Sequence, residues 1–122
     1  MVRRRGFTLI ELLVVLSIIA VLLSIAAPRY FRHVELAKEA VLRENLAVLR
    51  EAIDQYAADK GHAPATLEEL ADARYVRAVP VDPLTGSNKT WVLNAGSDGT
   101  GIEDVHSGAP GYSREGASYA DW

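Results

Sequence analysis

The chain has 122 residues, a net charge of −3, 49% hydrophobic residues, 24% charged residues and no cysteine. Its length fits one small domain, and its composition excludes a wholly disordered chain, a collagen-like repeat and a strongly basic nucleic-acid binder. The lack of cysteine excludes disulfides, thiol catalysis and cysteine-ligated zinc. The hydrophobic residues are concentrated near the N-terminus, where Glu11 is the single charged residue among the 23 residues between Arg5 and Arg29.

Residues 7–27 form an apolar segment of the length that a helix needs to cross a bilayer, which is roughly 20 residues. Arginines at positions 3–5 and a mostly acidic remainder predict a cytoplasmic N-terminus and a C-terminal part outside the membrane. A cleaved secretory signal is the simplest alternative, but the segment exceeds the usual apolar core of such signals. A plain membrane anchor leaves Glu11 unexplained, because an intramembrane carboxylate costs about 2.5 kcal/mol or more.

The sequence RRRGFTLIELLVVL, residues 3–16, resembles the class III leader of type IV pilins and of the pseudopilins of type II secretion. This resemblance implies that a prepilin peptidase removes residues 1–6 by cleaving between Gly6 and Phe7, methylates the new Phe7 amine and leaves the apolar helix in place. The new amine offers a partner for the carboxylate, since an unpaired charge is expensive in a low dielectric. We therefore expect Glu11 of one copy to pair with the Phe7 amine of a neighbouring copy and to set the assembly register.

An amphipathic helix is predicted beyond the membrane segment. Apolar side chains recur there at spacings of three and four residues, at Leu42, Leu46, Leu49, Ile53 and Tyr56. We expect one helix from about Thr8 to Lys60, with a kink at Pro28 and a stop at Gly61.

Charged residues on this helix are spaced to pair with one another. Glu39 lies four residues before Arg43, and Arg50 lies four residues before Asp54. Because residues four apart are neighbours on a helix surface, we expect both pairs to form there.

Shorter elements follow the long helix. Thr66 and Glu69 form a capping box that opens a short helix ending at about Ala73. Residues 75–86 are expected to be extended and to end in a turn, and strands are expected at 91–93 and 102–106 around a hairpin loop. The predicted fold class is α+β: a long N-terminal helix, with a transmembrane half and an amphipathic half, packed on a small antiparallel β-sheet with a loop-rich C-terminus.

The C-terminal part extends the resemblance. The motif VPVDPLTG at 79–86, an aromatic strand at Trp91 and the ending YADW at 119–122 are similar to the major, G-type pseudopilin of type II secretion. The resemblance implies a type IV pilin-like fold with residues 28–122 as a periplasmic globular domain.

The same resemblance implies what this protein does. It implies a structural subunit of a periplasmic pseudopilus, a single-pass protein of the bacterial inner membrane that assembles into a helical homo-oligomeric filament. The implied partners are prepilin peptidase, minor pseudopilins and an inner-membrane assembly platform. The alternatives are a type IV pilin or minor pilin for adhesion, twitching or DNA uptake, and a monomeric membrane-anchored binding module.

Neither catalysis nor nucleic-acid binding is indicated. His33, His62 and His106 are far apart in sequence and lie in no metal-ligand spacing, and we find no catalytic constellation. Removal of residues 1–6 leaves 10 basic against 16 acidic residues, a net charge of −6. Such a chain gains little from displacing the counterions of DNA. We therefore expect neither an enzyme nor a partner of nucleic acid.

The resemblance also implies a calcium ion in the C-terminal loop, held by aspartates and backbone carbonyls. The side chains that we assign as candidate ligands are Asp104, Ser107 and Asp121. The sequence departs from the family pattern at Pro110, because a proline stands where the family has a ligand aspartate. The alternative is a loop held without a metal, by hydrogen bonds and by Tyr119 and Trp122.

Overall fold

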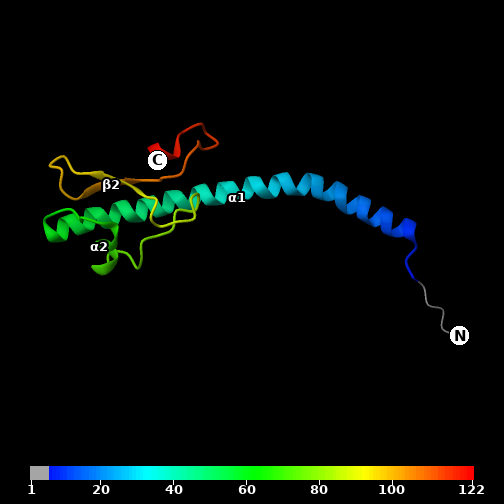
Figure 1. Cartoon of the computed structure of the whole chain (residues 1–122), viewed down its shortest axis with the longest axis horizontal. Coiled ribbons are helices and arrows are strands. Elements are labelled where there is room, and N and C mark those ends of the chain that lie inside the picture. The colour runs from blue at the N-terminus through cyan, green and yellow to red at the C-terminus, as the bar shows by residue number, and fades with distance from the viewer. Residues whose placement is uncertain (1–5) are drawn as a thin grey trace. The chain divides into compact units, whose positions relative to one another are not determined.

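The computed structural model describes residues 6–122, and the arginines of the expected leader lie outside this range. Its helices are α1 (Leu9–Lys60) and α2 (Leu67–Asp72), its strands are β1 (Val92–Ala95) and β2 (Ile102–His106), and a 3₁₀ helix, η1, spans Tyr119–Asp121 (Figure 1). This composition of elements confirms the α+β fold class. The chain divides into two units, one ending at Leu36 and one spanning Ala37–Trp122, and each is described by itself.

The first unit contains the apolar part of α1. The most apolar stretch of 18 residues has a mean hydropathy of 2.9, and none of it is buried within the chain. Ser17 and Ser24 donate their hydroxyls to the carbonyls of Leu13 and Val21, as expected for hydroxyls that must be satisfied in lipid. By length and composition this helix can cross a membrane. The helix continues through Pro28, where the expected kink stays a prediction.

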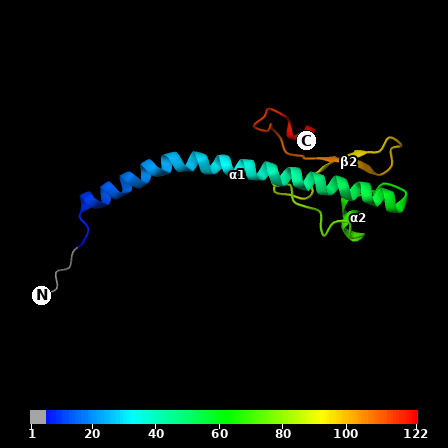
Figure 2. The ribbon, with the colours of Figure 1, turned by 180° about the vertical axis from the view of Figure 1, so that it is seen from behind.

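The second unit is built on the amphipathic part of α1. The predicted apolar stripe is buried, and its residues are Leu42, Leu46, Leu49, Ile53 and Tyr56. Leu67 and Leu70 of α2 and Ile102 and Val105 of β2 cover this stripe. The hairpin runs along one side of this part of α1, and α2 lies on the other side (Figures 1 and 2). Since each buried leucine contributes about 1.5–3 kcal/mol, this stripe is the main source of stability in the unit.

The two strands form the predicted antiparallel hairpin. Val92 pairs with His106 and Leu93 with Val105, and the register becomes irregular between Asn94 and Ala95. The amide of Ile102 donates to the carbonyl of Pro64 at 2.8 Å, which ties the start of β2 to the connection between the helices.

The cap of α2 follows the prediction with one difference. The hydroxyl of Thr66 accepts from the amide of Glu69 at 3.3 Å. The carboxylate of Glu69 accepts from the amide of Ala65 at 3.0 Å, one residue before the residue that a standard capping box uses. The helix ends at Asp72, with Ala73 as its C-terminal cap.

The two charge pairs predicted within α1 are wrong, because the charged side chains contact the C-terminal segment instead. Glu39 accepts a hydrogen bond of 2.8 Å from the hydroxyl of Tyr119. The guanidinium of Arg43 lies 3.7 Å from Glu115 and 4.4 Å from the ring centroid of Trp122. This face of α1 is therefore a contact surface for residues 107–122.

The turn at residues 80–86 is organised by the fully buried carboxylate of Asp82. Its Oδ1 accepts from the amide of Leu84 at 2.9 Å, and its Oδ2 accepts from the hydroxyl of Ser107 at 2.5 Å. The hydroxyl of Ser107 in turn accepts from the amide of Ala109. An added Cβ at Gly108 would lie 2.0 Å from the carbonyl oxygen of Thr90, so only glycine fits there. Asp82 thus joins the turn to the start of the C-terminal segment.

We predict that Asp82→Ala lowers the free energy of unfolding of the second unit by about 1–3 kcal/mol, because buried donors lose their acceptor. Urea unfolding of the full chain in detergent, followed by the emission of the buried Trp91, measures this change. Glu44→Ala, an exposed helical substitution, is the control and should change stability by less than about 0.5 kcal/mol. Equal stability of the two variants would contradict the role of Asp82.

Candidate functional site

The start of α1 is a capping box that the sequence analysis missed. The carbonyl of Thr8 accepts the first helical hydrogen bond, from the amide of Leu12 at 3.1 Å. The hydroxyl of Thr8 accepts from the amide of Glu11 at 3.2 Å, and Glu11 Oε2 accepts from the amide of Thr8 at 3.5 Å. The Thr-x-x-Glu signal is the one that predicted the cap of α2. Glu11 therefore has a local structural role, in addition to any role between copies.

Gly6 and Phe7 precede this cap, and the fold does not depend on the side chain at either position. The side chain of Phe7 is 88% exposed. Gly6 has no heavy atom within 4 Å of an added Cβ, and its φ is not in the left-handed region. No contact among the described residues requires glycine at position 6.

Phe7 and Glu11 line the same shallow hollow, whose volume is about 390 Å³. Its other lining residues are Ile10, Val14 and Val15. Among the described residues, Glu11 is the only charged one in this lining. The structure thus places both predicted assembly residues at one hollow, with the carboxylate among exposed apolar side chains.

The three candidate calcium ligands do not share one site. Ser107 and Asp121 line a hollow of about 380 Å³ together with Asn94 and His106, and Asp104 does not. Ser107 is 1% exposed, and its hydroxyl already bonds Asp82. Within residues 6–122, no group of three or more histidine, aspartate or glutamate side chains has an arrangement that could hold a metal ion.

Asp104 has a cationic partner from its own chain. Its Oδ1 accepts from Arg50 Nε at 2.9 Å and from the amide of Val105 at 2.8 Å. Burial acts to raise the pKa of Asp104, but the Val105 amide and the Arg50 guanidinium together hold this pKa below its ordinary value. As the structure stands, the donor set does not fit calcium, and calcium binding stays a prediction.

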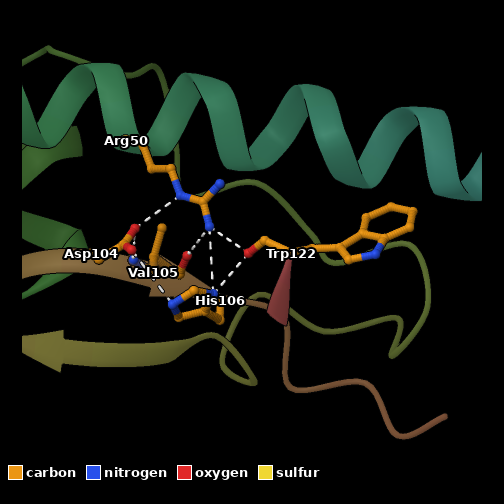
Figure 3. Close-up of polar contacts among 5 residues, drawn as sticks. All are labelled: Arg50, Asp104, Val105, His106 and Trp122. Atoms are coloured by element: carbon orange, nitrogen blue, oxygen red, sulfur yellow. Dashed lines mark hydrogen bonds and ion pairs between the residues drawn. The ribbon is translucent and has the colours of Figure 1, made fainter. Parts of the chain in front are cut away.

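Arg50 is the residue of this region that sequence reasoning missed. It was predicted to pair with Asp54, but it reaches β2 and Trp122 instead (Figure 3). A signal was present in the sequence: Arg50 lies four residues after Leu46 and three before Ile53, so it borders the apolar stripe and not the solvated face.

Comparison with known proteins shows similarity both at the N-terminal segment and over most of the chain. Residues 1–27 match the family model described as the prokaryotic N-terminal methylation motif. The chain is 32% identical over 113 residues to type II secretion system core protein G of Escherichia coli (strain K12), covering 80% of this chain and 77% of that protein. It is 33% identical over 99 residues to the protein of the same name in Klebsiella pneumoniae, covering 68% and 71%.

A relative with a different name is also similar. Fimbrial protein EcpC of Eikenella corrodens is 32% identical over 104 residues, covering 81% of this chain and 66% of that protein. No solved structure matches the chain.

An exposed apolar helix that begins in a methylation motif and continues into a small α+β unit defines a type IV pilin-like protein. Together with the identity over most of its length, this places the chain in the family of type II secretion system core protein G.

We predict that Thr8→Ala frays the first turn of α1, because the Glu11 amide loses its acceptor. Loss of such a cap costs about 1 kcal/mol, so hydrogen exchange of the Glu11 amide should accelerate about fivefold in the detergent-solubilised chain. Thr8→Ser keeps the hydroxyl and should exchange at the wild-type rate. Wild-type exchange in Thr8→Ala would mean that the capping box does not form.

Proposed function

We propose that this chain is the main structural subunit of a periplasmic pseudopilus in type II secretion, and that it assembles through the start of α1. The observation that carries the proposal is the Glu11 carboxylate, which lies beside Phe7 in the part of α1 where the large apolar side chains, from Leu9 to Ile25, are exposed. The names of the relatives and their sequence identity to this chain support the assignment to type II secretion. The role is structural and involves no catalysis by this chain.

Processing creates the partner of Glu11. A prepilin peptidase cleaves between Gly6 and Phe7 and methylates the Phe7 amine. The match of residues 1–27 to the methylation motif supports this step. The conformation and surroundings of Gly6 give no folding reason for glycine, so the protease is what requires a small residue there.

The local cap does not satisfy Glu11 in a membrane. The Thr8 amide is a neutral donor that reaches only Oε2, at 3.5 Å. A carboxylate within the apolar segment costs about 2.5–3.5 kcal/mol on insertion scales. An ammonium group offsets this cost far better than an amide does, because charge-assisted hydrogen bonds are stronger and the attraction grows in a low dielectric. The segment itself offers no lysine or arginine, so the ammonium comes from the Phe7 amine of a neighbouring copy.

Pairing of this kind fixes one axial register. A neighbour displaced along the filament would bury the carboxylate and the amine separately, and each would then pay its desolvation cost without a partner. The exposed apolar side chains of Leu9–Ile25 supply the packing surface, first to lipid and then to other copies. The proposal places the N-terminus in the cytoplasm and residues 28–122 in the periplasm, with minor pseudopilins and an inner-membrane assembly platform as partners.

A type IV pilin is the second candidate, favoured by the similarity to fimbrial protein EcpC. The Glu11 pairing is the same in both cases. Neighbouring genes separate the two: a secretin, an assembly ATPase and further pseudopilins indicate secretion, and pilus retraction machinery indicates a pilus.

We predict that Glu11→Gln leaves processing and membrane insertion intact but reduces sheared filaments at least tenfold. The side-chain carbonyl oxygen of glutamine still accepts a hydrogen bond from the main-chain amide of Thr8, so the cap is kept and only the negative charge is lost. Electron microscopy of overexpressing cells counts the filaments, and mass spectrometry reports the mature chain.

Two variants separate the charge from the cap. Thr8→Ala keeps the carboxylate and should assemble, whereas Glu11→Val loses both functions and should not. Normal filament numbers from Glu11→Gln would refute the pairing and leave Glu11 with the cap alone.

We predict that Gly6→Val blocks cleavage without harming the fold, because no heavy atom of the described residues lies within 4 Å of an added Cβ. The chain should remain in the membrane fraction at its full, unmethylated mass. Ala20→Val, an exposed change within the retained helix, should be cut and methylated as wild type. A mature, methylated Gly6→Val chain would place the cleavage site elsewhere.

A further inference from the structure

The guanidinium of Arg50 joins three parts of the second unit that are distant in sequence. From α1, its Nε donates to Asp104 Oδ1 at 2.9 Å, and its Nη2 donates to the Val105 carbonyl at 2.9 Å. Nη2 also donates to the main-chain oxygen of Trp122 at 2.5 Å and lies 3.5 Å from Nδ1 of His106 (Figure 3). One cationic side chain thus fastens both β2 and the end of the C-terminal segment to α1.

The acceptors around Arg50 are of the kind that hold calcium: one side-chain carboxylate and two main-chain oxygens. Asp104, the only side-chain carboxylate among them, was itself a predicted calcium ligand. A divalent cation near Asp104 would be repelled by the guanidinium, which already neutralises that carboxylate. The guanidinium is planar, permanently charged and able to donate in several directions, so it serves several oxygens at once.

The segment that Arg50 fastens contains little regular secondary structure. Residues 107–122 contain one turn of 3₁₀ helix and an isolated bridge between Tyr112 and Ser118. An irregular segment of this kind needs enthalpic contacts to offset its conformational entropy. Its polar contacts with α1 include those at Glu39 and Arg43, on the same side of the helix as Arg50. Tyr119 and Trp122 also pack against the apolar core.

We propose that Arg50 is the resident cation of this unit: it orders residues 107–122 in the place of a calcium ion, so the segment needs no metal. This inference concerns the second unit alone and stands apart from the assembly role of Glu11. Of the two alternatives left by the sequence, a metal-held loop and a loop held by its own side chains, the proposal adopts the second.

Hydrogen exchange of the full chain in detergent tests the proposal, with chelator and with millimolar calcium. In wild type, exchange in residues 107–122 should be equal in the two conditions. Arg50→Met should accelerate exchange at least tenfold in residues 107–122, with residues 42–56 still protected. Arg77→Met removes an exposed arginine and should behave as wild type.

Two results would overturn the proposal: calcium slowing wild-type exchange in residues 107–122 tenfold, or Arg50→Met exchanging as wild type. If Arg50→Met also loses protection in residues 42–56, the milder variant Arg50→Lys is used to test the role of the guanidinium. Lysine keeps the charge but not the fork of donors, so faster exchange confined to residues 107–122 supports the role of the guanidinium. Wild-type exchange in Arg50→Lys contradicts it.

Discussion

A carboxylate within an apolar helix is the constraint on which the first unit depends. Burying the side chains of Leu9–Ile25 in lipid is favourable, and Glu11 is the one residue that opposes it. The Thr8 cap gives Glu11 a neutral donor, which orients the carboxylate beside Phe7, and no cationic side chain of residues 6–122 pairs with it. The proposed pairing supplies the positive charge from a neighbouring copy.

The elements that could be predicted are those set by short sequence patterns: helical spacings of three and four residues, capping signals, and strand segments around a glycine-rich turn. The bounds of α1, the α2 cap and the hairpin all follow from such local patterns. The charge pairs within α1 failed because the same local rule ignores partners far along the chain, such as Asp104 for Arg50. The Thr8 cap was missed for another reason: Thr8 and Glu11 have the spacing of a capping box, but they lie within an apolar segment, where an intramembrane carboxylate is expected to seek a positive charge.

A polar row on α1, beside the apolar stripe, contacts the C-terminal segment, for which the sequence predicted no regular structure. Glu39, Arg43 and Arg50 are separated by four and seven residues, so they lie along one side of the helix. Each contacts the C-terminal segment, through Tyr119, Trp122 or both β2 and Trp122. Sequence periodicity reports hydrophobic rows well, but it does not reveal which charged row is covered, because covered and solvated charges have the same spacing.

The carboxylates of the two units differ in their surroundings, and this difference bears on the proposed function. In the part of the chain that the structure describes, no buried side-chain nitrogen or oxygen lacks a hydrogen-bond partner. The carboxylate of Asp82, fully buried in the second unit, is satisfied by its own turn and by Ser107. Glu11, by contrast, is exposed on the apolar surface of the first unit, which the proposal places in the membrane. A charge in an apolar setting is stabilised when an opposite charge from another molecule pairs with it. This contrast supports the proposal that assembly uses the start of α1.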